Sequence, residues 1–223
     1  QTSAGQSVEI LPFFGHAFPS DERSSIDRLS QISLTNPDGQ LVELDRVSDA
    51  TLNTGALTDE GVYVVGTRQA RGYWTRTTEG GERLPRSKVE NAVRCSYSDN
   101  GSKTLVQVGD ANAAASINTP IGHRLEIVPI DNPLAQQTGE TLQIKVLFEG
   151  QPHAGPLMVF HSESGEDPYL MTETDASGLA SMVLEGPAPW LLLAHGEIDY
   201  PDPTVCDVES FYASLTFFTA SNN

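Results

Sequence analysis

The sequence predicts an all-β protein made of two β-sandwich domains, the second immunoglobulin-like or transthyretin-like, and three observations support this fold class. Short apolar runs separated by Gly, Pro, Asn and Asp recur roughly every 8 to 12 residues, which is the spacing of sandwich strands. No stretch has a sustained helical period. The length of 223 residues suits two domains of about 100 to 120 residues, each able to bury its own core.

We place the first domain at residues 1–115 and predict its elements from turn chemistry. Residues 31–44 form a hairpin around Asn36-Pro37-Asp38-Gly39, because Pro suits the start of a turn and Gly supplies a positive φ. Tyr63 follows Gly61 in an Asp-x-Gly-x-Tyr pattern. This pattern resembles the corner of immunoglobulin-like sheets in which a Tyr hydroxyl ties a loop to the sheet.

Residues 70–91 interrupt the strand pattern with a basic insertion that carries aromatic side chains. We expect this insertion to be long and exposed, with a turn of helix at 87–93. The following segment, 93–109, is predicted to be a hairpin about Asp99-Asn100-Gly101, since such residues favour turns.

The second domain is placed at residues 116–223, because the segment 110–120 is small, polar and without periodicity. Seven short strands are predicted in it, with turn residues between them. They are 124–130, 141–149, 156–162, 169–175, 180–185, 190–196 and 211–219. Seven strands over about 100 residues are typical of an immunoglobulin-like sandwich.

Composition and motifs exclude several classes of function. Thirty acidic against thirteen basic residues give a formal charge of −17, which would repel a nucleic acid backbone. No apolar run is long enough for direct membrane insertion. The sequence lacks the motifs of serine hydrolases, phosphate-binding loops, zinc proteases and dinucleotide sites. We therefore expect a non-enzymatic protein without a nucleic acid partner.

The two cysteines, Cys95 and Cys206, are too few for a disulfide framework and lack zinc-ribbon spacing. Three interpretations of Cys206 stay open: a disulfide with Cys95, a soft metal ligand, or a small buried residue. A bridge would join the last loop of the second domain to the insertion side of the first. It would also require an oxidising compartment.

Four phrases carry a resemblance to a known family: "RLEIVPIDNPLAQQTGETLQIKVLFEGQPHAGPLMVF", "TDASGLASM", "PAPWLLLAH" and "ESFYASLTF". Together they resemble a bacterial family of unknown function that is related to the periplasmic component of nickel and cobalt uptake systems. The resemblance implies an exported or periplasmic β-sandwich protein that binds a transition-metal ion (Ni, Co, Cu or Zn). A membrane transporter or receptor would then be its partner.

The candidate metal ligands are His16, His195, Asp207 and Glu209. Transition metals favour imidazole nitrogen, with carboxylate or thiolate co-ligands. His16 lies between aromatic residues with carboxylates just beyond it. His195 ends an apolar strand at a sandwich rim, where binding sites are commonly built, and an acidic loop follows it. For each histidine a hydrogen-bonded structural role stays open as the alternative.

A second hypothesis is a structural, adhesive or carbohydrate-binding module that acts through the 70–91 insertion. Its candidate ligand surface is Arg71, Tyr73, Trp74 and Arg76. Exposed Trp and Tyr beside Arg can stack on sugar rings or anchor a partner protein. The alternative is that these side chains only cover the open end of the first domain.

Overall fold

The computed structural model describes residues 1–20, 22–109, 117–186 and 188–219. In these ranges the chain forms strands and two short 3₁₀ turns, η1 (Ile26–Arg28) and η2 (Arg86–Lys88). The all-β prediction is therefore confirmed. Within the same ranges, no helix has the length and apolar character needed to span a membrane.

The described residues form seventeen strands. They are β1 (Glu9–Ile10), β2 (Leu29–Thr35), β3 (Leu41–Val42), β4 (Asp45–Ser48), β5 (Thr51–Asn53), β6 (Gly61–Gln69), β7 (Gly72–Thr77), β8 (Gly81–Glu82), β9 (Ala92–Val108), β10 (Leu125–Pro129), β11 (Thr141–Phe148), β12 (Gln151–Pro152), β13 (Pro156–His161), β14 (Leu170–Glu173), β15 (Leu179–Val183), β16 (Trp190–Asp199) and β17 (Val208–Phe217). All seven strands predicted beyond residue 116 are present, and β12 is additional.

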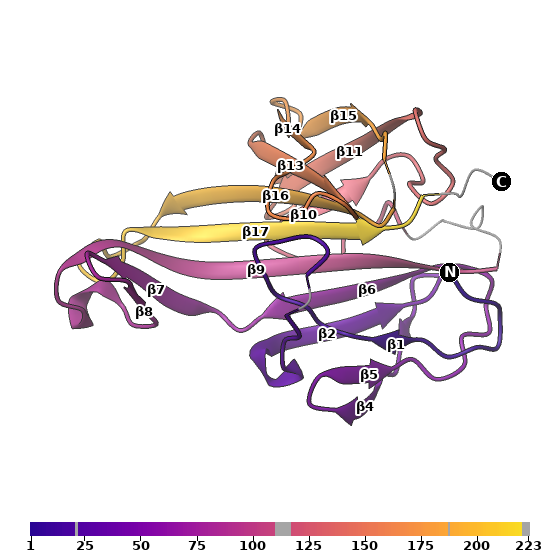
Figure 1. Ribbon diagram of the computed structural model, residues 1–223, viewed down its shortest axis with the longest axis horizontal. Coiled ribbons are helices and arrows are strands. Elements are labelled where there is room, and N and C mark those ends of the chain that lie inside the picture. The colour runs from indigo at the N-terminus through magenta and orange to yellow at the C-terminus, as the bar shows by residue number, and fades with distance from the viewer. Residues whose placement is uncertain (21, 110–116, 187, 220–223) are drawn as a thin grey trace.

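One large sheet runs through both halves of the chain, in the order β14-β13-β16-β17-β9-β6-β2-β3 (Figure 1). The halves meet where β17 pairs in parallel with β9, from Val208 opposite Ser96 to Thr216 opposite Thr104. The proposed boundary after residue 115 falls among residues 110–116, which lie outside the described residues. The division into domains 1–115 and 116–223 therefore stays a prediction.

A second sheet, formed by β10, β11, β12 and β15, covers one part of the long sheet. In Figure 1 these strands lie above the right-hand part of β16 and β17, and the left-hand ends of both strands extend beyond them. The main core fills the space between the two layers with side chains such as Ile127, Ile144, Trp190, Leu192 and Phe217. Along β16, buried residues alternate with partly exposed ones, as expected for a strand of a sandwich.

The ends of the long strands beyond the second sheet form what we call the distal region, residues 70–98 and 197–210. It contains the predicted insertion, which is the β7–β8 hairpin followed by η2. β7 pairs with β9 from Gly72 opposite Ser98 to Thr77 opposite Ala92. The insertion is thus part of the long sheet and widens it at this end.

The hairpin predicted for residues 93–109 is wrong, because β9 is one continuous strand from Ala92 to Val108. The residues that suggested a turn serve tertiary contacts instead. Asp99 binds the guanidinium groups of Arg68 and Arg71. Gly101 lies under the His123 ring, which would collide with a Cβ atom at that position.

Two local predictions for the first half are confirmed. β2 and β3 form the hairpin around Asn36 and Gly39, and the Gly39 N–H donates to the Asn36 carbonyl at 2.9 Å. The Asp59 N–H donates to the Tyr63 hydroxyl at 3.2 Å. Tyr63 is buried in the core beside Leu34 and therefore ties the loop before β6 to the sheet.

Candidate functional site

A disulfide joins Cys95 of β9 to Cys206 in the loop between β16 and β17. Asp207, beside it, accepts a hydrogen bond from the Cys95 N–H at 2.7 Å and forms an ion pair with Arg86 at 2.8 Å. The Arg86 N–H in turn donates to the Val205 carbonyl at 2.8 Å. These contacts fasten the insertion to the 200–207 loop, so Asp207 has a structural role here.

Glu209 is also held by an arginine. Its carboxylate forms an ion pair with Arg124 at 2.7 Å, and the Arg124 guanidinium lies over the Phe211 ring at 4.5 Å from the ring centre. Arg124 also binds Glu149. Both carboxylates that were candidate metal ligands are thus neutralised by guanidinium groups.

His195 lies half-buried on β16, and its contacts all lie on one face of the sheet. Its Nε2 is 3.2 Å from the Ser210 hydroxyl and 3.7 Å from the Glu197 carboxylate. The ring stacks on Tyr212 at a centroid distance of 4.4 Å. Burial lowers the pKa of His195 despite the opposing charge of Glu197, so the imidazole is neutral at neutral pH.

The structure does not bring His16, His195, Asp207 and Glu209 together as a metal centre. His16 is exposed in the loop between β1 and η1. Glu209 pairs with Ile198, three residues beyond His195, and an odd separation in a strand puts side chains on opposite faces. Among the described residues, no group of three or more His, Cys, Asp or Glu side chains could hold a metal ion.

The second predicted surface is divided by the alternation of β7. Tyr73 points to one face, where its hydroxyl is 2.8 Å from that of Tyr200 and its ring packs on Tyr97 at 4.7 Å. Arg71 binds the buried carboxylate of Asp99 at 2.6 Å. Because side chains alternate along a strand, Trp74 points to the opposite face. Arg71 and Tyr73 therefore belong to a network of structural contacts.

Trp74 and Arg76 lie together on the other side of the β7–β8 hairpin. The Trp74 indole lies against Gly81 of β8 and would collide with a Cβ atom there. Arg76 pairs with Gly81 in the strand register and is exposed. Trp74 itself is 48% exposed. The glycine thus gives the indole a flat support on one side and leaves the rest of the ring to solvent.

The strand register extends this face from Trp74 to His195 across four strands. Trp74 pairs with Ser96, Ser98 pairs with Ser210, and Tyr212 pairs with His195. Residues paired in this way lie on the same face of a sheet. We call this face of the sheet the outer face. It consists of Trp74, Arg76, Arg94, Ser96, Ser98, His195, Glu197, Ser210 and Tyr212.

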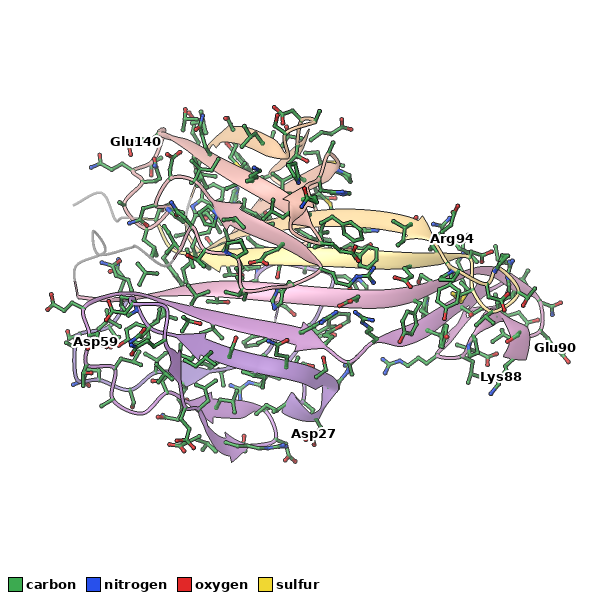
Figure 2. The ribbon with its side chains drawn as sticks, turned by 180° about the vertical axis from the view of Figure 1, so that it is seen from behind. Asp27, Asp59, Lys88, Glu90, Arg94 and Glu140 are labelled. Carbon is green, nitrogen blue, oxygen red and sulfur yellow. A yellow bond between two sulfur atoms is a disulfide. The ribbon has the colours of Figure 1, made fainter. Side chains whose placement is uncertain are left out.

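Polar side chains occupy the outer face between Trp74 and the stacked rings of Tyr212 and His195. Arg94 binds Glu197 through a hydrogen bond of 2.5 Å that links β9 to β16. Figure 2 shows Arg94 at the same end of the molecule as Lys88 and Glu90. Sequence reasoning missed Arg94, Ser210 and Tyr212 as site residues. The sequence indicates which residues of one strand share a face, but it does not indicate that β17 pairs in parallel with β9 and so brings these strands side by side.

Comparisons with known proteins give the family. A family model described as "Domain of unknown function (DUF4198)" matches residues 1–198. No curated protein matches the chain significantly. Among solved structures, the chain is similar to the "D0-D1 domain of Intimin", with 14% identity, a TM-score of 0.24, and coverage of 98% of this chain and 94% of that one. It is also similar to the four N-terminal immunoglobulin domains of Dscam1, with 11% identity, a TM-score of 0.22, and coverage of 98% and 42% respectively. TM-scores this low do not establish a shared fold.

Proposed function

This chain belongs to that family of unknown function, and we propose that it is an exported, non-enzymatic protein that binds carbohydrate through its outer face. The observation that carries the proposal is Trp74. Its indole is supported by Gly81, is 48% exposed, and shares a sheet face with Arg94, Glu197 and His195.

The chemistry of the outer face suits a sugar chain. The apolar face of a sugar ring can stack on the indole, and its hydroxyls can bond to groups that both donate and accept. Arg94 supplies donors, Glu197 supplies acceptors, and the partly exposed Ser98 supplies a hydroxyl. A few polar groups placed around an aromatic anchor are the usual composition of a specific binding site.

Export is supported by the Cys95–Cys206 disulfide, since disulfides persist in oxidising compartments and are rare in the cytosol. The disulfide also stiffens the end of the sheet that carries Trp74. A rigid site loses less conformational entropy when it binds its ligand.

The test is binding to a glycan array, followed by titration of each hit in solution. We expect Trp74→Ala to weaken binding at least about 10-fold, the loss expected for an aromatic anchor. The matched control is Leu41→Ala, which removes an exposed apolar side chain from β3. Binding that survives Trp74→Ala unchanged, or the absence of any glycan ligand, would contradict the proposal.

The transition-metal hypothesis stays a prediction, together with its transporter or receptor partner. One contact favours it, because the neutral imidazole of His195 lies beside the Glu197 carboxylate, and these are two suitable ligand types. Calorimetry with nickel, cobalt, copper and zinc separates the two functions. Metal binding that His195→Ala abolishes and Trp74→Ala preserves would favour the metal role.

A further inference from the structure

Lys103 and Glu126 form a charged pair inside the molecule, away from the outer face. Lys103 lies on β9 of the long sheet and Glu126 on β10 of the second sheet. Their side chains are each 3% exposed, and the Lys103 ammonium contacts the Glu126 carboxylate. A pair so completely removed from water carries a large desolvation cost.

The chain after residue 120 forms a cradle of N–H groups around the Glu126 carboxylate. The Ile121 N–H donates to Oε1 at 2.6 Å, and the N–H groups of Gly122 and His123 donate to Oε2 at 3.1 Å each. Lys103 Nζ also donates to the Ile127 carbonyl at 3.1 Å. Both reacting groups are therefore held in fixed positions.

We propose that Lys103 and Glu126 condense into an intramolecular amide that cross-links the two sheets. The ammonium first gives a proton to the carboxylate. The Nζ lone pair then attacks the Glu126 carboxyl carbon, a C–N bond forms and a C–O bond breaks. The departing oxygen leaves as one water molecule, which takes both of its protons from the original ammonium, so no oxidant or other co-reactant is needed.

Three features of the site favour this reaction. Fixed contact raises the effective concentration of the amine to about 10⁵ M or more. This concentration favours amide formation, whereas hydrolysis is favoured for separate molecules in dilute aqueous solution. Burial lowers the pKa of Lys103 despite the charge of Glu126, which favours the nucleophilic neutral amine. The N–H groups of Gly122 and His123 bind Oε2, the oxygen that becomes negative when the amine attacks and that stays in the amide.

The His123 ring lies close to the pair, since it covers Gly101, which is two residues from Lys103 on the same face of β9. The ring is buried against Gly101, and burial lowers the pKa of His123 although Glu126 raises it in part. The imidazole is therefore neutral near pH 7 and adds no second positive charge beside Lys103. Each side chain of the pair is only 3% exposed, and this burial keeps bulk water away from the product.

The experiment is the intact mass of the purified full chain, after denaturation and reduction of the disulfide. We expect the mass to fall short of the sequence by one water molecule. We also expect tandem mass spectrometry to find the peptide containing Lys103 joined to the peptide containing Glu126. The variant Lys103→Met, Glu126→Gln, which keeps an oxygen acceptor for the N–H groups, should have its full mass.

A full mass for the wild-type chain, with Lys103 open to acylation after denaturation, would overturn the proposal and leave an ordinary buried ion pair. This decision needs only the wild-type protein, so it stands even where the double variant fails to fold. The cross-link does not depend on the proposed carbohydrate binding, and neither result affects the other.

Discussion

Strands β9, β16 and β17 pass through two environments, and the two are stabilised differently. In the part covered by the second sheet, the side chains between the layers are apolar and buried, as at Leu192, Ala213 and Leu215. Among the described residues, no second sheet covers the distal region. There the strands are joined by the Cys95–Cys206 disulfide, by ion pairs and by a tyrosine cluster.

The difference shows what a single sheet needs when it extends beyond its sandwich. A sheet is normally stable because one face is packed against another layer. Without that layer, the distal region contributes little apolar burial, and covalent and polar cross-links have to replace it. The outer face lies on the opposite side of these strands, because His195 and Tyr212 alternate with the core residues Ala194 and Ala213.

The largest expected effect comes from removing the disulfide. Its two cysteines are 111 residues apart, and closing a loop of about 100 residues contributes about 4.7 kcal/mol in the chain-entropy model. We expect the variant Cys95→Ala, Cys206→Ala to lose most of this amount in urea unfolding. Hydrogen exchange should rise first in the distal region, and a uniform rise over the whole chain would contradict the comparison.

A substitution in the core should destabilise the covered part of the strands instead of the distal region. Leu192 is fully buried between the two layers, and Leu192→Ala should cost about 3 kcal/mol through lost burial and a cavity. The control is Leu191→Ala, one residue away on the opposite face and only partly buried, with an expected loss below about 1 kcal/mol. Equal losses in urea unfolding would show that the layered packing does not dominate here.

The covered part was predictable from sequence, and the distal region was not, for a physical reason. The covered strands are short apolar segments bounded by turn residues, and β11 also alternates polar and apolar residues from Thr141 to Val146. The contacts of the distal region join residues far apart in the chain, such as Arg86 with Asp207. Local periodicity carries no information about such pairs.

Asp99 illustrates how a local signal can mislead. Asp-Asn-Gly favours a turn, yet here it lies in the middle of β9. The carboxylate is needed to pair with Arg68 and Arg71, and the glycine makes room for His123. The candidate site was predicted only in part for a related reason. Trp74 and His195 were identified, but their placement on one face depends on the pairing of β17 with β9.

Asp99 lies where the covered part meets the distal region, and its effect should depend on pH. Burial raises its pKa, but Arg68 and Arg71 outweigh burial and lower it overall. A lowered pKa stabilises the fold above the unfolded value of about 3.9 and loses this effect as pH falls through the folded value. Asp99→Asn should therefore cost about 2 kcal/mol at pH 7. The gap to wild type in urea unfolding should close on acidification below about pH 4, and a pH-independent gap would exclude the charge as its cause.

The smallest expected effect comes from the cluster of Tyr73, Tyr97 and Tyr200, whose rings pack together in the distal region. Tyr73→Phe removes the hydrogen bond to the Tyr200 hydroxyl but keeps the ring contact with Tyr97, so we expect a loss of about 1 kcal/mol in urea unfolding. The hydroxyl of Tyr73 also raises the pKa of Tyr200 to about 12, and the variant should return it towards its ordinary value in an ultraviolet titration. Tyr212→Phe, on the outer face, is the matched control and should change neither quantity. An unchanged Tyr200 titration in Tyr73→Phe would show that the two hydroxyls are not bonded in solution.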